Sequence, residues 1–440
     1  MFLYHLYDLV ADFINPERGK LGHKPPEKLL ADSPTGFVFG QKCRFYLAKR
    51  ETEDGHILVV GGPGSGKSSC LAIPSIMAWQ QRIFAIDIKG EIVKATSNHR
   101  PAAKVCNPLD RGTYGYDPFF LLIRSQNVVQ DAREIVFAII PKPHEVKDPF
   151  WVDGAQNLLT GAILHFFHLG YSFTEIMIMV QSTSVAELIS EIGESESEDA
   201  RLFVSQFTGM DLKTLVGIFA EISNHIIVFA TDPAIKDCLT RKKIVTPFDL
   251  EKGFDVFLQI PEDRLDQWKP LITLIVNQFM KHFERREDAQ ATPVLFLLDE
   301  FPRLGKVEAV NGLATLRSKK ITICLIAQSL AQLDGIYGRD QRKVIADNCS
   351  YKAILNATDA ETQEYFSRLV GTYERARVSH GQSFDGEDTD TVKGSSRNVT
   401  SEDRRVIKPE EFATLKDIVL LTPYGFCRAK KAPYYIKRIA

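Results

Sequence analysis

Residues 61–68 read GGPGSGKS and match the pattern G-x-x-x-x-G-K-[ST], in which a glycine-rich loop ends in a lysine and a hydroxyl residue. The apolar run ILVV comes directly before the loop, and SSCLAI follows it with helical character. Glycines let backbone N–H groups curl around phosphate oxygens, and the helix that follows points its positive end at the anion. The pattern therefore predicts a phosphate-binding loop at a strand-to-helix turn of an α/β fold.

This loop assigns roles to individual residues. Lys67 can reach the β- and γ-phosphate oxygens, and the Ser68 hydroxyl can ligate Mg²⁺. We therefore expect ATP and Mg²⁺ as ligands. The residues expected to contact the nucleotide are Gly61, Gly62, Pro63, Gly64, Ser65, Gly66, Lys67, Ser68 and Ser69.

A second candidate element is the run PVLFLLDEF, in which a buried strand, Val294–Leu298, ends in two carboxylates. In enzymes with such a loop, an acid at this place helps to hold Mg²⁺, and a neighbouring glutamate can polarise the attacking water. We assign the metal role to Asp299 and the general-base role to Glu300. Two surface acids after a strand would be the plainer interpretation, but the phosphate loop argues against it.

Composition sets broad limits on the class of protein. The chain has 440 residues, a formal net charge of -2 and 44% hydrophobic residues, which fits two domains or one domain with an insertion. Near-neutral charge argues against a protein that binds nucleic acid over its whole surface, though it allows a local basic patch. Cysteines are odd in number and form no CxxC pair, which predicts reduced thiols and neither a disulfide framework nor a zinc site. They are Cys43, Cys70, Cys106, Cys238, Cys324, Cys349 and Cys427.

Short apolar runs alternate with helical patterns at both ends of the chain, which predicts a mostly parallel sheet covered on both faces. From about Phe119 to about Thr240, apolar residues recur only at helical spacing, as expected for an inserted all-α domain. The predicted strands are His56–Val60, Ile83–Ile88, Lys104–Asn107, Asp255–Ile260, Val294–Leu298, Thr322–Ala327, Tyr351–Leu355 and Ile418–Leu421.

Two polar stretches interrupt this pattern. Residues 193–199 (GESESED) are acidic and read as a solvated loop between helices. Residues 374–405 contain few apolar side chains and read as a mobile or disordered excursion. We therefore predict four parts: an N-terminal segment 1–30, a nucleotide-binding domain 31–118 and 243–440 with the flexible stretch 374–405, and an all-α domain 119–242.

The chain opens with MFLYHLYDLVADFI, which carries two aspartates and is too short to span a bilayer. We expect a helix docked on its own domain, and we expect no later segment long and apolar enough to cross a membrane. The chain is therefore predicted to be cytoplasmic.

Further motifs give a specific resemblance. Asp299–Lys306 (DEFPRLGK) resembles the region after the acidic strand in TraG-type coupling proteins of type IV secretion, and the strand ending at Gln328 resembles that family's third motif. IDIKGE at 86–91, NPLD at 107–110, FWVDGAQNLL at 150–159, FLQIPED at 257–263 and the run 404–421 follow in the family's order. The resemblance covers the chain from about residue 30 to its end.

The resemblance implies a RecA-like ATPase with an inserted all-α domain, which forms a hexameric ring and moves DNA through a central channel. It implies that Gln328 senses the γ-phosphate and that Arg317 reaches the neighbouring subunit's site as an arginine finger, with Arg303 as a competing candidate. An exposed helix arginine with no such role remains the alternative for Arg317. The basic residues Arg317, Lys319 and Lys320 could touch DNA phosphates, although such clusters are more often solvated surface.

The implied partners are non-specific single- or double-stranded DNA, relaxosome or secreted protein substrates, and the ATPases of the secretion channel. We expect a homo-hexamer when active and a monomer in isolation. Typical members begin with transmembrane helices, so this chain would be a membrane-less or truncated member, placed at the inner face of the membrane by partners. Two alternatives stay open: another hexameric RecA-like translocase, such as a chromosome or phage DNA pump, or a protein-cargo receptor with minor ATP turnover.

Overall fold

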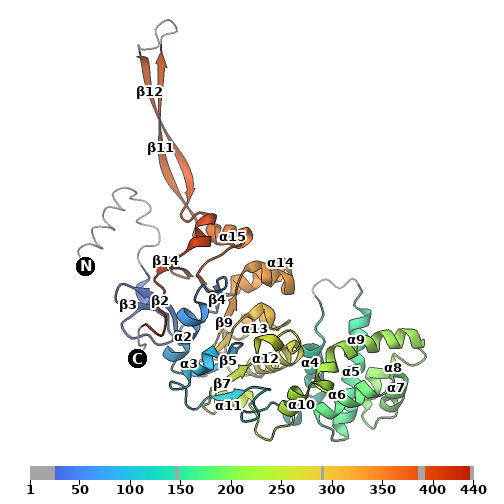
Figure 1. Cartoon of the computed structure of the whole chain (residues 1–440). Helices are drawn as coiled ribbons and strands as arrows, with labels where there is room; N and C mark the ends of the chain where they lie inside the picture. Colours follow the sequence, from blue (N-terminus) through green and yellow to red (C-terminus); the bar gives the residue numbers. More distant parts are fainter. Residues whose placement is uncertain (1–24, 144–147, 289–291, 385–391, 437–440) are drawn as a thin grey trace.

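The computed structural model describes residues 25–143, 148–288, 292–384 and 392–436 (Figure 1). Within them, a nine-stranded sheet has the order β14-β13-β10-β4-β9-β8-β5-β7-β6. Neighbouring strands from β10 to β6 are parallel, whereas β13 pairs antiparallel with β10 and β14. The predicted α/β fold with a mostly parallel sheet is confirmed. The strands are β4 (Ile57–Val60), β5 (Arg82–Asp87), β6 (Lys104–Cys106), β7 (Val256–Gln259), β8 (Val294–Leu298), β9 (Ile321–Ala327), β10 (Tyr351–Ile354), β13 (Ile418–Thr422) and β14 (Gly425–Ala429).

Both faces of the sheet are buried. In β4, Leu58 and Val60 belong to one apolar core, and Ile57 and Val59 to the other, because successive strand side chains point to opposite faces. The first core also contains α12 (Lys269–Glu284), α13 (Ala309–Thr315) and α14 (Leu330–Asn348). The second contains α2 (Ile73–Ala78) and α3 (Glu91–Thr96). Burial on both sides explains why the strands read as continuous apolar runs.

A small antiparallel sheet was not predicted. It consists of β1 (Leu30–Ala31), β2 (Phe37–Lys42) and β3 (Phe45–Lys49), in the order β1-β3-β2. Its strand β2 packs on α2, where the Val38 N–H donates to Ser75 Oγ at 2.9 Å. The connection between β2 and β3 is only two residues long, with Cys43 at a φ of 54°. The apolar runs FVF at 37–39 and FYLA at 45–48 are nevertheless typical of short buried strands, so this sheet was predictable from the sequence.

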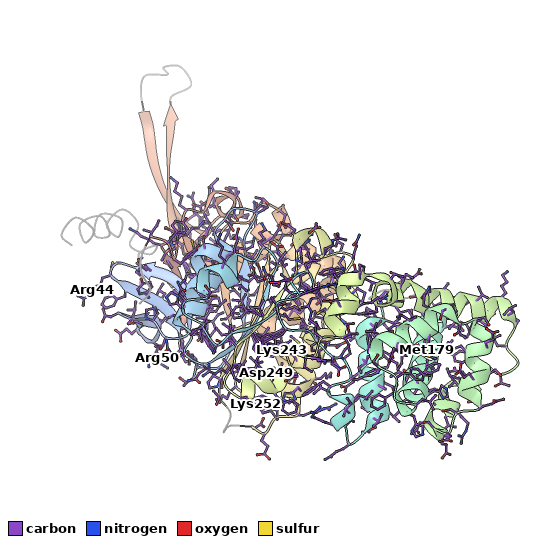
Figure 2. All side chains as sticks on the ribbon, turned by 60° about the horizontal axis from the view of Figure 1, so that its bottom comes forward. Arg44, Arg50, Met179, Lys243, Asp249 and Lys252 are labelled. Atoms are coloured by element: carbon purple, nitrogen blue, oxygen red, sulfur yellow. The ribbon has the colours of Figure 1, made fainter. Side chains whose placement is uncertain are left out.

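A lobe of helices leaves the sheet after β6, to the right in Figure 1. Among the described residues between 119 and 240 there is no strand, in agreement with the predicted block of helices. Figure 2 shows Met179 within this lobe and Arg44 on the small sheet, at opposite ends of the molecule. The helices of the lobe are α4 (Val128–Ile139), α5 (Phe150–His168), α6 (Phe173–Ser182), α7 (Val185–Gly193), α8 (Glu198–Ser205), α9 (Leu212–Thr231) and α10 (Pro233–Leu239). After them, α11 (Pro247–Glu251) leads back to the sheet.

Helix α9 corrects one expectation. It has 20 residues and a mean hydropathy of 1.5, so by length and composition it is apolar enough to cross a membrane, whereas no such segment was expected. Its buried side chains recur every three or four residues and form one stripe packed into the lobe. The packing of this stripe into the lobe explains why its residues are apolar. The stripe consists of Leu215, Ile218, Ile222, Ile226 and Phe229.

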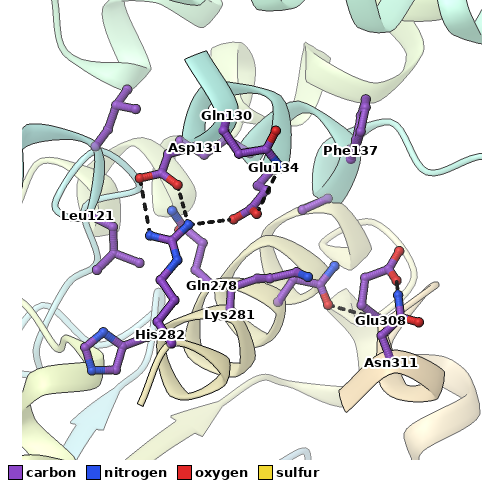
Figure 3. Close-up of a pocket in the computed structure, with 15 residues that line it drawn as sticks. Leu121, Gln130, Asp131, Glu134, Phe137, Gln278, Lys281, His282, Glu308 and Asn311 are labelled. Atoms are coloured by element: carbon purple, nitrogen blue, oxygen red, sulfur yellow. Dashed lines mark hydrogen bonds and ion pairs between the residues drawn. The ribbon is translucent and has the colours of Figure 1, made fainter. Parts of the chain in front are cut away.

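Ion pairs join the lobe to the sheet domain. Arg285, which follows α12, binds Asp131 and also Glu134, the latter at 3.3 Å. Figure 3 shows Asp131 and Glu134 together on α4. Asp131 is 7% exposed, so its carboxylate depends on this partner. Beside the pair lies a cavity of about 320 Å³ between α4, α12 and α13. The lobe is thus attached by a charged contact as well as by apolar packing.

The polar stretch 374–405 differs from the expected irregular excursion. Its described residues belong to two long antiparallel strands, β11 (Thr372–Phe384) and β12 (Val392–Arg405), which project from the body after α15 (Ala360–Val370) (Figure 1). Strand pairing satisfies backbone hydrogen bonds without an apolar core. A two-stranded ribbon has no face to bury, so its composition resembled that of a loop.

The acidic stretch 193–199 also differs in part. Only residues 194–197 connect α7 to α8, and within them Ser195 is buried and bonds His165 Nδ1 through its Oγ at 2.7 Å. The His165–Ser195 contact therefore anchors this connection to α5. The expected N-terminal docking helix lies outside the described residues.

Candidate functional site

The predicted site residues converge at one edge of the sheet. β4, β9 and β8 are neighbouring parallel strands, so their carboxyl ends lie side by side. The phosphate loop follows β4, Gln328 follows β9, and Asp299 and Glu300 follow β8. The structure thus brings together the loop, the two acids and the glutamine, as the sequence predicted.

The phosphate loop is tightly wound. Gly64 and Gly66 have φ values of 68° and 98°, a region that favours glycine. A Cβ on Gly66 would lie 2.9 Å from Cys70 Sγ, so a larger residue would also collide there. Within the loop, the Ser65 N–H donates to the Gly62 carbonyl at 3.2 Å. The positive φ values explain why the loop requires glycine at these two positions.

Lys67 is buried inside the loop, at 8% exposure. Its Nζ donates to the carbonyls of Gly61 at 2.7 Å and Gly62 at 3.3 Å. Burial lowers the pKa of Lys67, while the nearby carboxylates of Glu300 and Asp299 oppose that shift. The lysine is therefore held within reach of an anion bound in the loop.

The loop also contains a buried polar atom with no protein partner. Among the described residues, Ser65 Oγ has no hydrogen-bond partner although it is buried. Buried hydroxyls in folded proteins are normally paired. An anion with several acceptor oxygens, such as a phosphate, could accept a hydrogen bond from this hydroxyl.

The two acids after β8 have different environments. Burial, followed by the charge of Glu300, raises the pKa of Asp299 from 3.8 to about 7. The Glu300 N–H donates to Asp299 Oδ1 at 3.0 Å, and Glu300 itself adopts a left-handed conformation with φ 47°. That conformation costs about 1 kcal/mol in a non-glycine residue, so its surroundings must hold it there.

Gln328 contacts the second acid directly. Its Nε2 lies 3.0 Å and 3.3 Å from the two carboxylate oxygens of Glu300, and its backbone N–H donates to Gln332 Oε1 at 3.2 Å. The glutamine therefore links the end of β9 to the proposed general base. A substitution that removes the Gln328 amide would therefore remove a hydrogen bond that orients the Glu300 carboxylate.

Mg²⁺ in phosphate-transfer sites keeps several waters and binds one or two carboxylates together with phosphate oxygens. Within the described ranges, no group of three or more His, Cys, Asp and Glu side chains is arranged to hold a metal. Asp299 and the half-buried Ser68 hydroxyl fit the smaller protein share that Mg²⁺ needs. A bound cation would also favour the charged form of Asp299.

Sequence reasoning missed two residues at this edge. Asp87 ends β5, is 1% exposed and accepts a hydrogen bond from the Val93 N–H at 2.8 Å. Burial raises the pKa of Asp87, and its charge contributes to the raised pKa of Asp299. The other residue is Asn356, after β10, whose Oδ1 accepts from the Gly62 N–H at 2.7 Å. The motif IDIKGE contained Asp87, whereas no motif signal marked Asn356.

The predicted cations do not join this cluster. Arg317 is exposed and precedes β9, so it lies at the opposite end of that strand from Gln328. Seven strand residues span about 20 Å, which places Arg317 out of reach of its own chain's site. Lys319 pairs with Asp288 at 2.9 Å and Lys320 with Asp54 at 3.3 Å.

The competing candidate Arg303 follows the acids and pairs with Glu262 at 3.1 Å. It belongs to the short 3-10 turn Phe301–Arg303, directly after Glu300. Arg303 is therefore close to its own chain's acids and tied to a surface carboxylate.

Known proteins resemble this chain over most of its length. The sequence model of the family described as "Type IV secretory system Conjugative DNA transfer" matches residues 23–439. Protein VirD4 of Agrobacterium fabrum is 26% identical over 429 residues, covering 92% of this chain and 63% of that protein. A conjugal transfer protein TraG of Escherichia coli is 25% identical over 412 residues, covering 83% and 62%. The chain thus spans less than two thirds of the length of these relatives.

Solved structures share the fold. The unbound bacterial conjugative coupling protein TrwBdeltaN70 superposes with a TM-score of 0.70 at 18% identity, covering 91% of this chain and 88% of that one. The plasmid coupling protein TrwB in complex with ADP and Mg²⁺ gives a TM-score of 0.70 at 17% identity, covering 96% and 94%. These matches confirm the RecA-like fold with a helical lobe.

Proposed function

The chain belongs to the conjugative DNA transfer family of type IV secretory systems, and from this membership we propose that it is an ATP-hydrolysing coupling protein. It would recruit DNA with its relaxosome, or protein substrates, and drive them into a secretion channel. TrwB, which shares the fold, binds ADP and Mg²⁺, and we propose ATP and Mg²⁺ as the ligands of this chain.

One observation carries the proposal: Lys67, Asp299, Glu300 and Gln328 meet at the carboxyl ends of three adjacent strands, with Gln328 bonded to Glu300. A site that only bound nucleotide would need the loop and a metal ligand. A base held by a glutamine beside the loop suits activation of a water molecule. Turnover is therefore the function that this geometry supports best.

In the proposed reaction, Lys67 moves from the loop carbonyls to the β- and γ-phosphate oxygens and balances their charge. Ser68 and Asp299 would hold Mg²⁺, which would supply positive charge beside the phosphates. Glu300 accepts a proton from the attacking water, and Gln328 orients Glu300 through its amide. The position of each side chain at the sheet edge supports its proposed role.

The site would be completed by a neighbouring subunit. We propose that Arg317 acts as a finger in trans within a hexameric ring, because the length of β9 separates it from its own chain's loop. An arginine supplied in this way stabilises charge on the transferred phosphoryl group. Arg303, paired with Glu262, is the competing candidate.

The layout supports the proposed division of labour. We propose residues 31–118 and 243–440 as the nucleotide-binding domain and residues 119–242 as the all-α domain. The ring would contact DNA phosphates without sequence preference, because base-edge contacts would stall movement. We place the chain in the cytoplasm, next to the secretion channel and its ATPases.

ATP turnover with and without DNA tests the proposal. We expect hydrolysis by the wild-type chain to rise when single-stranded DNA of any sequence is added. Hydrolysis that responds to a protein substrate and not to DNA would favour a cargo receptor. Hydrolysis that responds only to double-stranded DNA would favour a chromosome or phage DNA pump, and no hydrolysis under any of these conditions would contradict the proposal.

A further inference from the structure

The start of the phosphate loop is held on both sides. On one side, the Gly61 N–H donates to the Ala327 carbonyl of β9 at 3.1 Å. On the other side, β10 runs parallel to β4, with Ile354 beside Val60, and the Leu355 N–H donates to the Val60 carbonyl at 2.9 Å. The loop then leaves the sheet, and backbone pairing between β4 and β10 ends there.

A side chain continues the contact where the backbone stops. Asn356 Oδ1 accepts from the Gly62 N–H at 2.7 Å, across 294 positions of sequence. A Cβ on Gly62 would lie 3.4 Å from Asn356 Oδ1 and 3.6 Å from Nδ2, so the amide group rests directly against this glycine. The Asn356 side chain thus supplies the acceptor that a backbone carbonyl would supply if the pairing of β4 and β10 continued.

The same peptide unit holds the catalytic lysine. The N–H of Gly62 and the C=O of Gly61 belong to one planar peptide group. Its N–H bonds Asn356, and its C=O accepts from Lys67 Nζ at 2.7 Å. The orientation of this peptide therefore sets where Lys67 is held, and Asn356 fixes that orientation from the far side.

We propose that Asn356 is a positioning residue for nucleotide binding: it keeps the loop that carries Lys67 in a binding-ready conformation. A loop ordered in advance loses less conformational entropy when phosphate binds. Once nucleotide is bound, its own contacts hold the loop, so the contribution of Asn356 belongs to affinity and not to the chemical step. The inference rests on the proposed ATP-binding function.

Two variants separate this role from a general effect on folding. Asn356→Ala removes the acceptor, whereas Asn356→Asp keeps an oxygen that can accept from the Gly62 N–H. Asn348→Ala is the matched control, since the Asn348 amide bonds the Val344 carbonyl at 2.9 Å within α14. All variants are compared with the wild-type chain by thermal melting.

The first measurement is amide hydrogen exchange of residues 58–64 in the nucleotide-free chain, which does not depend on any activity. Loss of one neutral hydrogen bond should speed exchange of the Gly62 amide about threefold to tenfold in Asn356→Ala. Asn356→Asp should retain the wild-type protection, and Asn348→Ala should leave this segment unchanged.

The second measurement is ATP hydrolysis. Asn356→Ala should raise KM for ATP about threefold to tenfold while kcat stays within about twofold. Unchanged loop exchange and unchanged KM in Asn356→Ala would overturn the inference, as would an equal effect of Asn348→Ala. A wild-type chain that neither binds nor hydrolyses ATP would instead overturn the proposed function, and the exchange result would still report on the hydrogen bond.

Discussion

Asp299 links the stability of the chain to its chemistry. Burial and the neighbouring Glu300 raise its pKa to about 7, whereas a carboxyl in an unfolded chain titrates near 3.8. Between these values the folded state holds a proton that the unfolded state has released, so stability falls as pH rises from about 4 to about 7. The ionised Asp299 carboxylate therefore lowers the stability of the folded chain at neutral pH, and a bound cation would reduce this loss.

Asp299→Asn should remove that dependence. We expect the nucleotide-free variant to melt at a higher temperature than the wild type at pH 8, and by a smaller margin at pH 5, because the penalty on the wild type accumulates between about pH 4 and about pH 7. Thermal melting at both pH values, without Mg²⁺, checks this. An equal shift at both values would mean that the charge of Asp299 has no part in it.

Glu300→Gln should separate binding from turnover. The amide keeps the size of the side chain but cannot accept a proton from water, while Ser68 and Asp299 still hold the metal. We expect ATP affinity within a few-fold of wild type and turnover lower by at least about a hundredfold. Equilibrium binding and steady-state hydrolysis are measured on the same preparation. A parallel loss of both would make Glu300 a structural or metal-binding residue.

At the residue scale, the sequence identified those site residues that belong to motifs with a fixed spacing along the chain. The loop, Asp299, Glu300 and Gln328 belong to motifs whose residues are close in the chain. Asp87 and Asn356 reach the site only because β5 and β10 lie beside other strands, a relation that depends on sheet order. No local pattern could have marked Asn356.

At the scale of elements, a single substitution can test the contact between α12 and α4. Arg285→Ala would leave the buried Asp131 carboxylate without its charged partner. Because the arginine is half exposed, we expect a loss of about 1–2 kcal/mol in unfolding free energy. Denaturant unfolding measures it, with Arg339→Ala as the control, since Arg339 is exposed and distantly paired with Glu361.

A double variant sharpens this test. If the cost arises from the unpaired carboxylate, Asp131→Asn combined with Arg285→Ala should recover part of the loss. Strict additivity of the two changes would show that Arg285 and Asp131 contribute independently and that the ion pair is not what joins the lobe to the sheet.

The predictability of the elements followed the hydrophobic pattern. Every predicted strand is present, within one residue at each end, because a sheet buried on both faces leaves an apolar run in the sequence. The small sheet β1-β3-β2 was not predicted although β2 and β3 contain short apolar runs. The ribbon β11–β12 was not predicted because two strands that pack on no core leave no such run. Helix α9 shows the converse, since an apolar stripe and an apolar span have similar composition.

At the scale of the whole molecule, the phosphate loop, the two acids and Gln328 lie together, whereas Arg317 lies at the far end of β9. If Arg317 acts in trans, Arg317→Ala should lower ATP turnover about a thousandfold under conditions in which subunits assemble. The neighbouring cation Lys319, paired with Asp288, offers a matched control in Lys319→Ala. Mixing Arg317→Ala with Glu300→Gln should restore activity, because some interfaces then combine an intact arginine with an intact base. No restoration would point to a site completed within one chain.

The most direct test of the account is the rate of ATP hydrolysis per chain across a series of protein concentrations, with single-stranded DNA present and Lys67→Ala as the blank. In the proposed role, Lys67 balances the charge of the β- and γ-phosphates, so its removal should abolish turnover while the chain stays folded. We predict that the wild-type rate per chain rises with concentration, as subunits complete one another's sites, and that DNA raises it further. A wild-type rate equal to that of Lys67→Ala at every concentration would contradict it.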